Sequence, residues 1–179
     1  MVQKPDYQKQ NEDFVAALVR ECIDRGTRAE LRRYWSERGK HYAYPVLGKL
    51  RAIDNQPREV VAALFATHDR DTLRAHRKGG LSVGGAFLDL AGGSRSKPAY
   101  DSTERHFRRL LACDSLDELA LQLHRLVKRL ERDSVPLDYE KLLRDLRFWS
   151  KSAERVKTDW SLDFWQASTD SETDRPDAA

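Results

Sequence analysis

Apolar side chains recur along most of the chain at spacings of three and four residues, the period of an amphipathic α-helix. Phe14, Leu18 and Cys22 predict a first helix that ends near Gly26. The following "TRAE" predicts a new helix, with Thr27 as N-cap and an acid three residues later as in a capping box. No stretch of strand length alternates between apolar and polar residues between turn signals. The pattern therefore predicts an all-α protein of about eight or nine helices.

Proline and serine mark helix starts in the middle of the chain. Pro45 predicts a short helix in "YPVLGKLRAI", and Ser82 is expected to cap another that runs through Leu90. Pro57 opens "PREVVAALFATH", in which one apolar stripe contains Val60, Val61, Leu64, Phe65 and His68. Glycine, serine and proline residues between positions 92 and 101 predict a loop. We place the boundary between an N-terminal helical lobe (1–95) and a C-terminal helical bundle (96–166) in this loop.

The second half repeats one signature of helix starts, a capping side chain followed three residues later by an acid. Asp101 precedes Glu104 in this way, and Ser115 precedes Glu118. Asp138 is expected to cap the next helix, and "AERVKTDWSLDFW" predicts a last one with three apolar residues in register, Val156, Trp160 and Phe164. These helices account for the chain up to residue 166.

Composition separates a basic body from an acidic end. The 179 residues are 40% hydrophobic and 34% charged, with a net charge of +3. Residues 167–179 contain four acids against Arg175 and no large apolar side chain, so we expect a disordered acidic tail. Without the net charge of this tail, the body carries about +6.

The same composition predicts a cytoplasmic chain. The N-terminal residues lack the apolar core of a signal peptide, and no run of about 18 apolar residues predicts a membrane span. Cys22 and Cys113 lie at apolar-periodic positions, which favours buried free thiols in a reducing compartment.

Basic residues lie opposite the apolar face of three consecutive predicted helices. In the first, Arg105, Arg108 and Arg109 oppose Phe107. In the second the basic stripe is Arg125, Lys128, Arg129 and Arg132, and in the third it is Lys141, Arg144, Arg147 and Lys151. Acids in this region gather at helix starts, where free N–H groups favour them. The basic residues run along whole helices, so local helix electrostatics does not account for them.

Two interpretations of these ridges remain open. Charged outer faces are common on helical bundles and need no ligand. Alternatively, the ridges, with Arg32 and Arg33 from the first half, bind a phosphate backbone, for which the planar guanidinium is well suited. His106 and His124 lie among these arginines and would then be additional phosphate donors.

The sequence contains only weak signals of an enzyme active site. His68 and Asp69, with Asp71 and His76 nearby, could begin a metal-dependent phosphohydrolase site, but His68 also continues the apolar stripe of its helix. The segment "GGLSVGG" lacks the Lys-Ser/Thr ending of a phosphate-binding loop. We therefore predict no catalytic residues, no metal and no cofactor.

The order of several segments resembles the small subunit of the type I-E CRISPR Cascade complex, the CasB family. These segments are "TRAELRR", "VVAALFATH", "LSVGGAFLDLA", "STERHFRRLLACDSLDELALQLHRLVKRL", "VPLDYEKLLRDLRFW" and "VKTDWSLDFW". The resemblance implies a two-lobed helical protein without catalytic activity. It also implies several partners: CRISPR RNA, target DNA and the displaced strand, the backbone and large subunits of Cascade, and a second copy of the chain.

The resemblance also indicates which residues contact nucleic acid. Position by position it points to Arg32, Arg33, Arg105, Arg109 and Arg125, and the helical periodicity adds Lys128, Arg129 and Lys151. The chain departs from the family at Glu104-Arg105-His106, where a second arginine is expected in place of His106. The alternative functions are a free-standing helical DNA-binding regulator and the metal-dependent phosphohydrolase.

Overall fold

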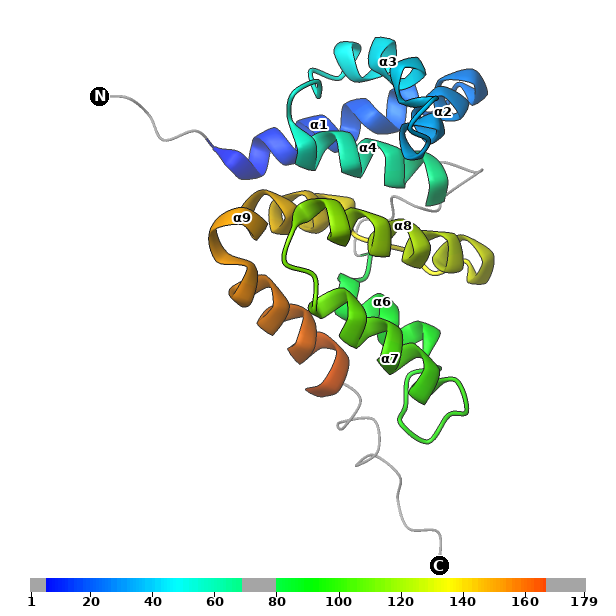
Figure 1. Ribbon diagram of the computed structural model, residues 1–179, viewed down its shortest axis with the longest axis vertical. Coiled ribbons are helices and arrows are strands. Elements are labelled where there is room, and N and C mark those ends of the chain that lie inside the picture. Colours follow the sequence, from blue (N-terminus) through cyan, green and yellow to red (C-terminus); the bar gives the residue numbers. More distant parts are fainter. Residues whose placement is uncertain (1–5, 69–79, 167–179) are drawn as a thin grey trace, which may run out of the picture.

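Helices make up most of the residues described by a computed structural model, 6–68 and 80–166 (Figure 1). Eight α-helices lie in these ranges: α1 Tyr7–Glu21, α2 Arg25–Arg32, α3 Tyr44–Lys49, α4 Gln56–His68, α6 Val83–Leu90, α7 Tyr100–Leu111, α8 Leu116–Asp133 and α9 Tyr139–Ser161. Two 3-10 turns, η1 Arg33–Trp35 and η2 Lys40–Ala43, follow α2, and a π-helical turn, η3 Leu162–Gln166, follows α9. The described ranges contain one isolated parallel bridge, between Leu81 and Leu137, and no strand. The predicted all-α class is confirmed.

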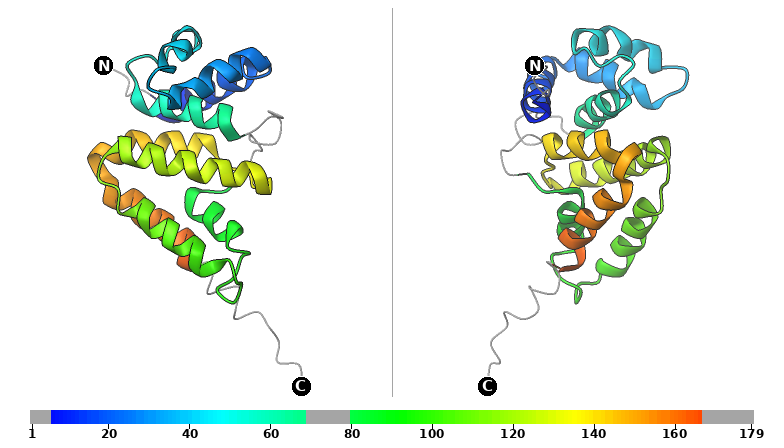
Figure 2. Two further views of the ribbon diagram at one scale, coloured as in Figure 1. Left: turned by 45° about the vertical axis from the view of Figure 1, so that its right-hand side comes forward. Right: turned by 90° about the vertical axis from the view of Figure 1, so that its left-hand side faces the viewer.

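The helices form two groups that meet along α4. Figures 1 and 2 show α1 to α4 on one side and α6 to α9 on the other, with α8 and the first half of α9 beneath α4 and α1. α6 packs against α7, α9 and η3, so it lies with the C-terminal helices. The division between residues 95 and 96 stays a prediction, and the predicted tail, 167–179, lies outside the described residues. None of the described helices has the length and apolar content needed to cross a bilayer.

α4 is buried on all sides. Every residue from Glu59 to His68 is buried, because α2 packs against one side of α4 and α8 and α9 pack against another. The predicted apolar stripe was therefore too narrow, since Ala62, Ala63 and Ala66 are buried as well. The small alanine side chains let neighbouring helices pack closely. α4 thus joins the two groups of helices in one core.

The buried polar side chains of α4 have partners, whereas the Nε of the partly buried Arg58 has none among the described residues. The Glu59 carboxylate accepts hydrogen bonds from the Tyr34 hydroxyl at 3.2 Å and from the Asp54 backbone N–H at 3.1 Å. Thr67 donates to the Ala63 carbonyl at 2.8 Å. Because an unpaired buried polar group costs about 1–3 kcal/mol, these contacts make the deep burial of α4 possible.

Three of the predicted helix starts are confirmed. The side chains of Ser82, Ser115 and Asp138 each accept a hydrogen bond from a backbone N–H three residues later, at the heads of α6, α8 and α9. These bonds satisfy one of the free donors of each helix terminus.

Two other predicted helix boundaries were wrong. α1 already ends at Glu21, and Asp24 rather than Thr27 caps α2, because the Asp24 carboxylate accepts the Thr27 N–H at 2.6 Å. α7 begins at Tyr100, before the predicted cap, and no side chain caps it. The buried Tyr100 ring stacks on Phe164 at 5.4 Å, so tertiary packing sets this helix start.

A kink at Ser152 divides α9. The backbone of Ser152 is non-helical (φ −152°, ψ 44°), which agrees with two separately predicted helices in this region. Across the kink the rings of Trp149 and Trp160 stack 5.7 Å apart. The kink turns the second half of α9 toward α6, where the Trp160 carbonyl meets Gly84.

A ring stack joins the two groups on the surface. Trp35 of η1 stacks on His124 of α8, with ring centroids 4.2 Å apart and planes 8° from parallel. The Trp35 indole also donates to the Ala63 carbonyl of α4 at 3.4 Å. The stack holds η1 against the middle of α8. Burial, and secondarily the charge of Lys128, lowers the pKa of His124 from 6.5 to about 4.

Replacing Gly84 with alanine should destabilise the protein. A Cβ at Gly84 would lie 2.0 Å from the Trp160 carbonyl oxygen, whereas at Gly85 its nearest neighbour is the Ser82 hydroxyl at 3.4 Å. Helix propensity alone favours alanine by about 1 kcal/mol, and overpacking costs about 1–3 kcal/mol or more. Thermal unfolding followed by circular dichroism should give a lower Tm for Gly84→Ala than for Gly85→Ala. Equal melting temperatures would contradict this packing.

The His124 stack should make stability depend on pH. The unfolded chain binds a proton at His124 below about pH 6.5, but the folded chain does so only near pH 4. Stability contributed by this residue is therefore lost as the pH falls from about 6.5 to about 4. His124→Phe keeps a ring against Trp35 and removes the titration, so its unfolding free energy should fall less steeply over this range. Parallel profiles in urea titrations of the two proteins would refute the assignment.

Candidate nucleic-acid interface

Seven of the eight predicted contact residues belong to four neighbouring elements, α2, η1, α7 and α8. We call these seven the basic ridge: Arg32, Arg33, Arg105, Arg109, Arg125, Lys128 and Arg129. The stack of Trp35 on His124 holds the end of α2 and η1 beside α8. A hydrogen bond of 3.4 Å from Nη2 of Arg129 to Oγ1 of Thr103 links α8 to α7. These contacts bring together basic residues from positions 32 to 129 of the chain.

The basic ridge forms no ion pair with a carboxylate of the described residues. Among the described residues, none of its seven side chains lies within 4.0 Å of a carboxylate oxygen. Neighbouring arginines differ: Arg108 pairs with Glu104 at 2.9 Å, and Arg132 pairs with Asp133 at 3.1 Å. The charge of the basic ridge is thus not neutralised within the described part of the protein.

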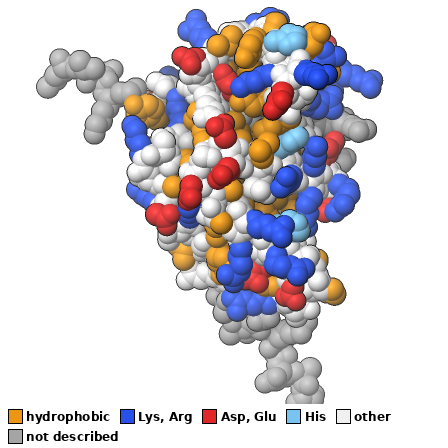
Figure 3. Space-filling model, in the orientation of Figure 1, with side chains coloured by type: hydrophobic (Ala, Val, Ile, Leu, Met, Phe, Trp, Pro, Cys, Tyr) orange, Lys and Arg blue, Asp and Glu red, His pale blue; other side chains and the backbone are white. Residues whose placement is uncertain are grey.

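The basic ridge is accessible to a ligand. Five of its side chains are exposed and two, Arg32 and Arg129, are partly buried. Figure 3 shows Lys and Arg side chains gathered down the right-hand half of one face, with only scattered Asp and Glu among them. Such an excess of one charge attracts polyanions.

Lys151 lies apart from the basic ridge. It precedes the kink of α9, and the Trp149 indole beside it donates to the Asp114 carbonyl at 3.4 Å, just before α8 begins. Arg129 lies near the opposite end of α8. The basic stripe of α9 also faces α1, because Arg147 donates to Asn11 at 2.7 Å. The structure does not bring the third predicted ridge onto the face formed by the other two.

The two histidines near the basic ridge are already engaged by the protein. His124 is half-buried on Trp35, and its lowered pKa of about 4 leaves it neutral at pH 7. His106 is exposed, and its Nδ1 lies 2.6 Å from the Ser102 carbonyl, to which it donates. The basic ridge therefore depends on arginine and lysine.

His68 is a structural residue of the core. Its Nε2 lies 2.8 Å from the Val135 carbonyl and must donate, so Nδ1 accepts from the Tyr139 hydroxyl, also at 2.8 Å. Both ring nitrogens are thus engaged by protein atoms. No group of three potential metal ligands occurs in residues 6–68 or 80–166. Asp69, Asp71 and His76 lie outside those ranges.

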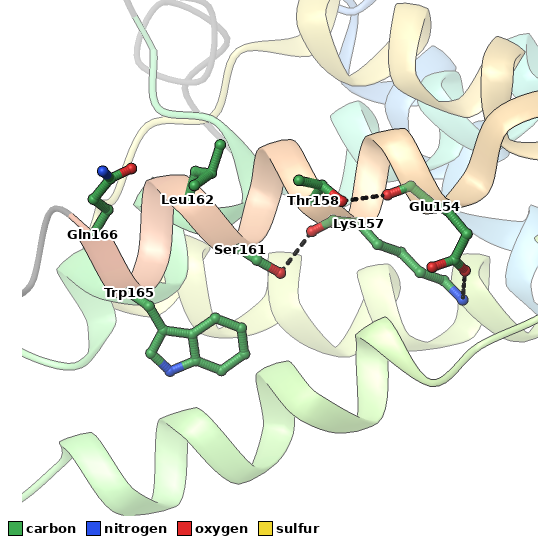
Figure 4. Close-up of a pocket in the computed structure, with 7 residues that line it drawn as sticks. All are labelled: Glu154, Lys157, Thr158, Ser161, Leu162, Trp165 and Gln166. Carbon is green, nitrogen blue, oxygen red and sulfur yellow. Dashed lines mark hydrogen bonds and ion pairs between the residues drawn. The ribbon is translucent and has the colours of Figure 1, made fainter.

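A shallow groove on α9 and η3, of about 540 Å³, lacks the chemistry of an active site (Figure 4). Its two hydroxyls donate to carbonyls of their own helix, Thr158 to Glu154 at 2.8 Å and Ser161 to Lys157 at 2.6 Å. The Lys157 ammonium pairs with the Glu154 carboxylate at 3.3 Å. Neither hydroxyl has a neighbouring base, so the groove contains no activated nucleophile. Its lining residues are Glu154, Lys157, Thr158, Ser161, Leu162, Trp165 and Gln166.

An exposed tyrosine beside the basic ridge was missed in the sequence. The Cζ atom of Arg33 lies 4.4 Å from the ring centroid of Tyr42 in η2. The only signal was the aromatic-rich "KHYAY" after a basic helix. Because apolar periodicity is absent from a 3-10 turn, the sequence could not show which of these rings is exposed.

Comparison with known proteins identifies the family. A family model described as CRISPR-associated protein Cse2 matches residues 27–165. No curated protein sequence matches the chain. CasB from Thermus thermophilus is 26% identical, with a TM-score of 0.64 and coverage of 87% of this chain and 97% of that one.

Two further solved structures have the same fold. A chain of a CRISPR RNA-guided surveillance complex is 24% identical, with a TM-score of 0.72 and coverage of 93% of this chain and 98% of that one. CasB from M. ruber is 22% identical, with a TM-score of 0.69 and coverage of 91% and 96%. The resemblance noted in the sequence is confirmed, and the chain belongs to the Cse2 family of CRISPR-associated proteins.

Proposed function

We propose that this chain is a non-catalytic, nucleic-acid-binding small subunit of a CRISPR RNA-guided surveillance complex. The basic ridge carries the proposal, because its cationic side chains from four elements have no carboxylate partner among the described residues. The family match and the shared fold with a chain of such a complex support it.

The basic ridge acts on the phosphate backbone rather than on the bases. Arginine can bond a phosphate through two parallel N–H groups, and neutralising phosphates releases counterions whatever the sequence. The exchange of DNA duplex for guide–target duplex is nearly balanced in energy, so backbone contacts of a few kcal/mol can shift it. In this role the subunit stabilises the guide RNA, the target DNA and the displaced strand.

Its partners follow from this role. They are CRISPR RNA and both DNA strands, the backbone and large subunits of Cascade, and a second copy of the chain, all within the cytoplasm. Leu121, 54% exposed on the polar side of α8, suits a subunit contact because it is apolar among charged neighbours.

A free-standing DNA-binding regulator is the second candidate, and the amino-acid composition of α7 and α8 disfavours it. A recognition helix reads bases through side chains such as asparagine and glutamine. α7 contains neither residue, and α8 contains only Gln122. The third candidate, a metal-dependent hydrolase, needs a free imidazole at His68, whose two nitrogens are hydrogen-bonded to protein.

Loss of basic-ridge residues should weaken nucleic-acid binding equally across sequences. Arg32→Ala/Arg33→Ala and Arg125→Ala/Arg129→Ala each remove two cations without carboxylate partners. On single strands, each lost phosphate contact should reduce the slope of log affinity against log salt by about 0.7. Fluorescence anisotropy at several salt concentrations measures this slope.

Arg108→Ala/Arg132→Ala is the matched control, since it removes two cations that are paired with carboxylates. It should change the salt slope less than either double variant. An equal effect of all three double variants would mean that binding depends only on the net charge of the protein and not on the basic ridge. A loss of affinity for one sequence only would favour the DNA-binding regulator.

Coexpression tests the assembly. Tagged full-length protein, produced with the Cascade backbone subunits and CRISPR RNA, should copurify with both in a fixed ratio. A protein that elutes alone and free of RNA would contradict its proposed role as a subunit.

A further inference from the structure

Tyr42 presents an aromatic ring at the end of the basic ridge. The side chain is 48% exposed, although a tyrosine ring usually loses much of its surface to packing. The Arg33 guanidinium lies over the ring, with Cζ 4.4 Å from its centroid. Among the described residues the Tyr42 hydroxyl has no hydrogen-bond partner, so no polar contact of the fold accounts for the position of the ring.

The other rings of this region are already engaged. Trp35 stacks on His124, and the hydroxyl of Tyr34 donates to Glu59 in the interior. Tyr44 is exposed to a similar degree, 43%, but no cation lies over its ring. Tyr42 thus combines an exposed ring with direct contact to a basic-ridge arginine.

The second neighbour of the Tyr42 ring is His41. The two rings lie 4.1 Å apart, centroid to centroid, and are tilted by 35°, so they do not form a parallel stack. His41 is exposed, so a base that stacks more strongly can displace it. The Arg33 guanidinium over the Tyr42 ring holds the ring in place, which lowers the entropy lost when a ligand binds.

Arg33 fixes where a bound strand would meet this ring. In a nucleotide the phosphate and the base are joined through one sugar. A phosphate bonded to Arg33 therefore brings its base close to the Tyr42 ring, which Arg33 already touches. Exposed aromatic rings beside cations are how proteins bind single strands without reading sequence, because every base has a face that can stack.

We infer that Tyr42 stacks on an unpaired base of a single strand bound at the basic ridge. This inference rests on the proposed function and adds a residue to its site, because a duplex keeps its bases stacked inside and offers none to the ring. Arg33 then serves twice, as a phosphate donor and as the support of the Tyr42 ring.

The test compares full-length protein with Tyr42→Ala on three labelled DNA ligands of one sequence: a single strand, the duplex, and a single strand with abasic sites. Loss of one stacking contact should weaken single-strand binding about 5- to 150-fold. The salt slope should not change, since no charge is lost. Affinity for the duplex and for the abasic strand should be the same in both proteins.

Three further variants serve as controls. Tyr42→Phe keeps the ring and should bind like the original chain, whereas Tyr42→Leu keeps only apolar bulk and should bind like Tyr42→Ala. Tyr44→Ala removes a nearby ring of similar exposure and should have no effect. Melting temperatures of all variants show whether each is folded; the exposed position predicts that they are.

The outcomes separate this inference from the proposed function. An unchanged affinity of Tyr42→Ala for the single strand, or an equal loss on the abasic strand, would overturn the stacking role. If Arg125→Ala/Arg129→Ala still weakens binding in that case, the basic ridge binds nucleic acid without a contribution from Tyr42. If the original chain binds none of the three ligands at low salt, the proposed function fails as well.

Discussion

The burial of α4 on all sides is the constraint on which the rest of the structure depends. A helix with no solvent-facing side needs neighbours all round, so the N-terminal helices and α8 and α9 pack on the same ten residues, Glu59 to His68. The polar side chains at its two ends are satisfied from opposite groups. Glu59 meets Tyr34 near the N-terminal helices, and His68 meets Tyr139 of α9. The two halves of the chain therefore share one core.

The basic ridge follows from this shared core. With α2 held on one side of α4 and α8 on another, η1 comes to lie beside α8, and Trp35 stacks on His124. Asp24 and Asp138 accept backbone N–H groups at the starts of α2 and α9, and the bond from Thr27 is the main cause of the lowered pKa of Asp24. Among the described residues neither carboxylate pairs with a basic-ridge side chain, so the cations of the ridge stay available to a ligand.

Whether a helix start could be predicted depended on the capping side chains near it. Ser115 and Asp138 are the nearest capping side chains to their helices, and both predictions are confirmed. At α2 two candidates lie three residues apart, and Asp24 caps the helix by accepting the N–H of Thr27. At α7 no side chain caps the helix, because the packing of Tyr100 against Phe164 begins the helix two residues before the start that a cap at Asp101 predicts. Such packing depends on residues 64 positions apart and leaves no local pattern.

The order of apolar and basic positions was enough to predict the helical class and the buried faces of the amphipathic helices α7 and α8, because helical periodicity is a local property. For α4, which is buried on all sides, the predicted apolar stripe was too narrow. That order could not predict which outward helix faces lie on the same side of the folded protein. The contact of Arg147 with Asn11 places the basic stripe of α9 beside α1, and Lys151 lies near the start of α8 whereas Arg129 lies near its end. Nor could it show that the Tyr42 ring is exposed and in contact with the Arg33 guanidinium. These relations depend on how helices pack around α4, and packing joins residues that the sequence keeps far apart.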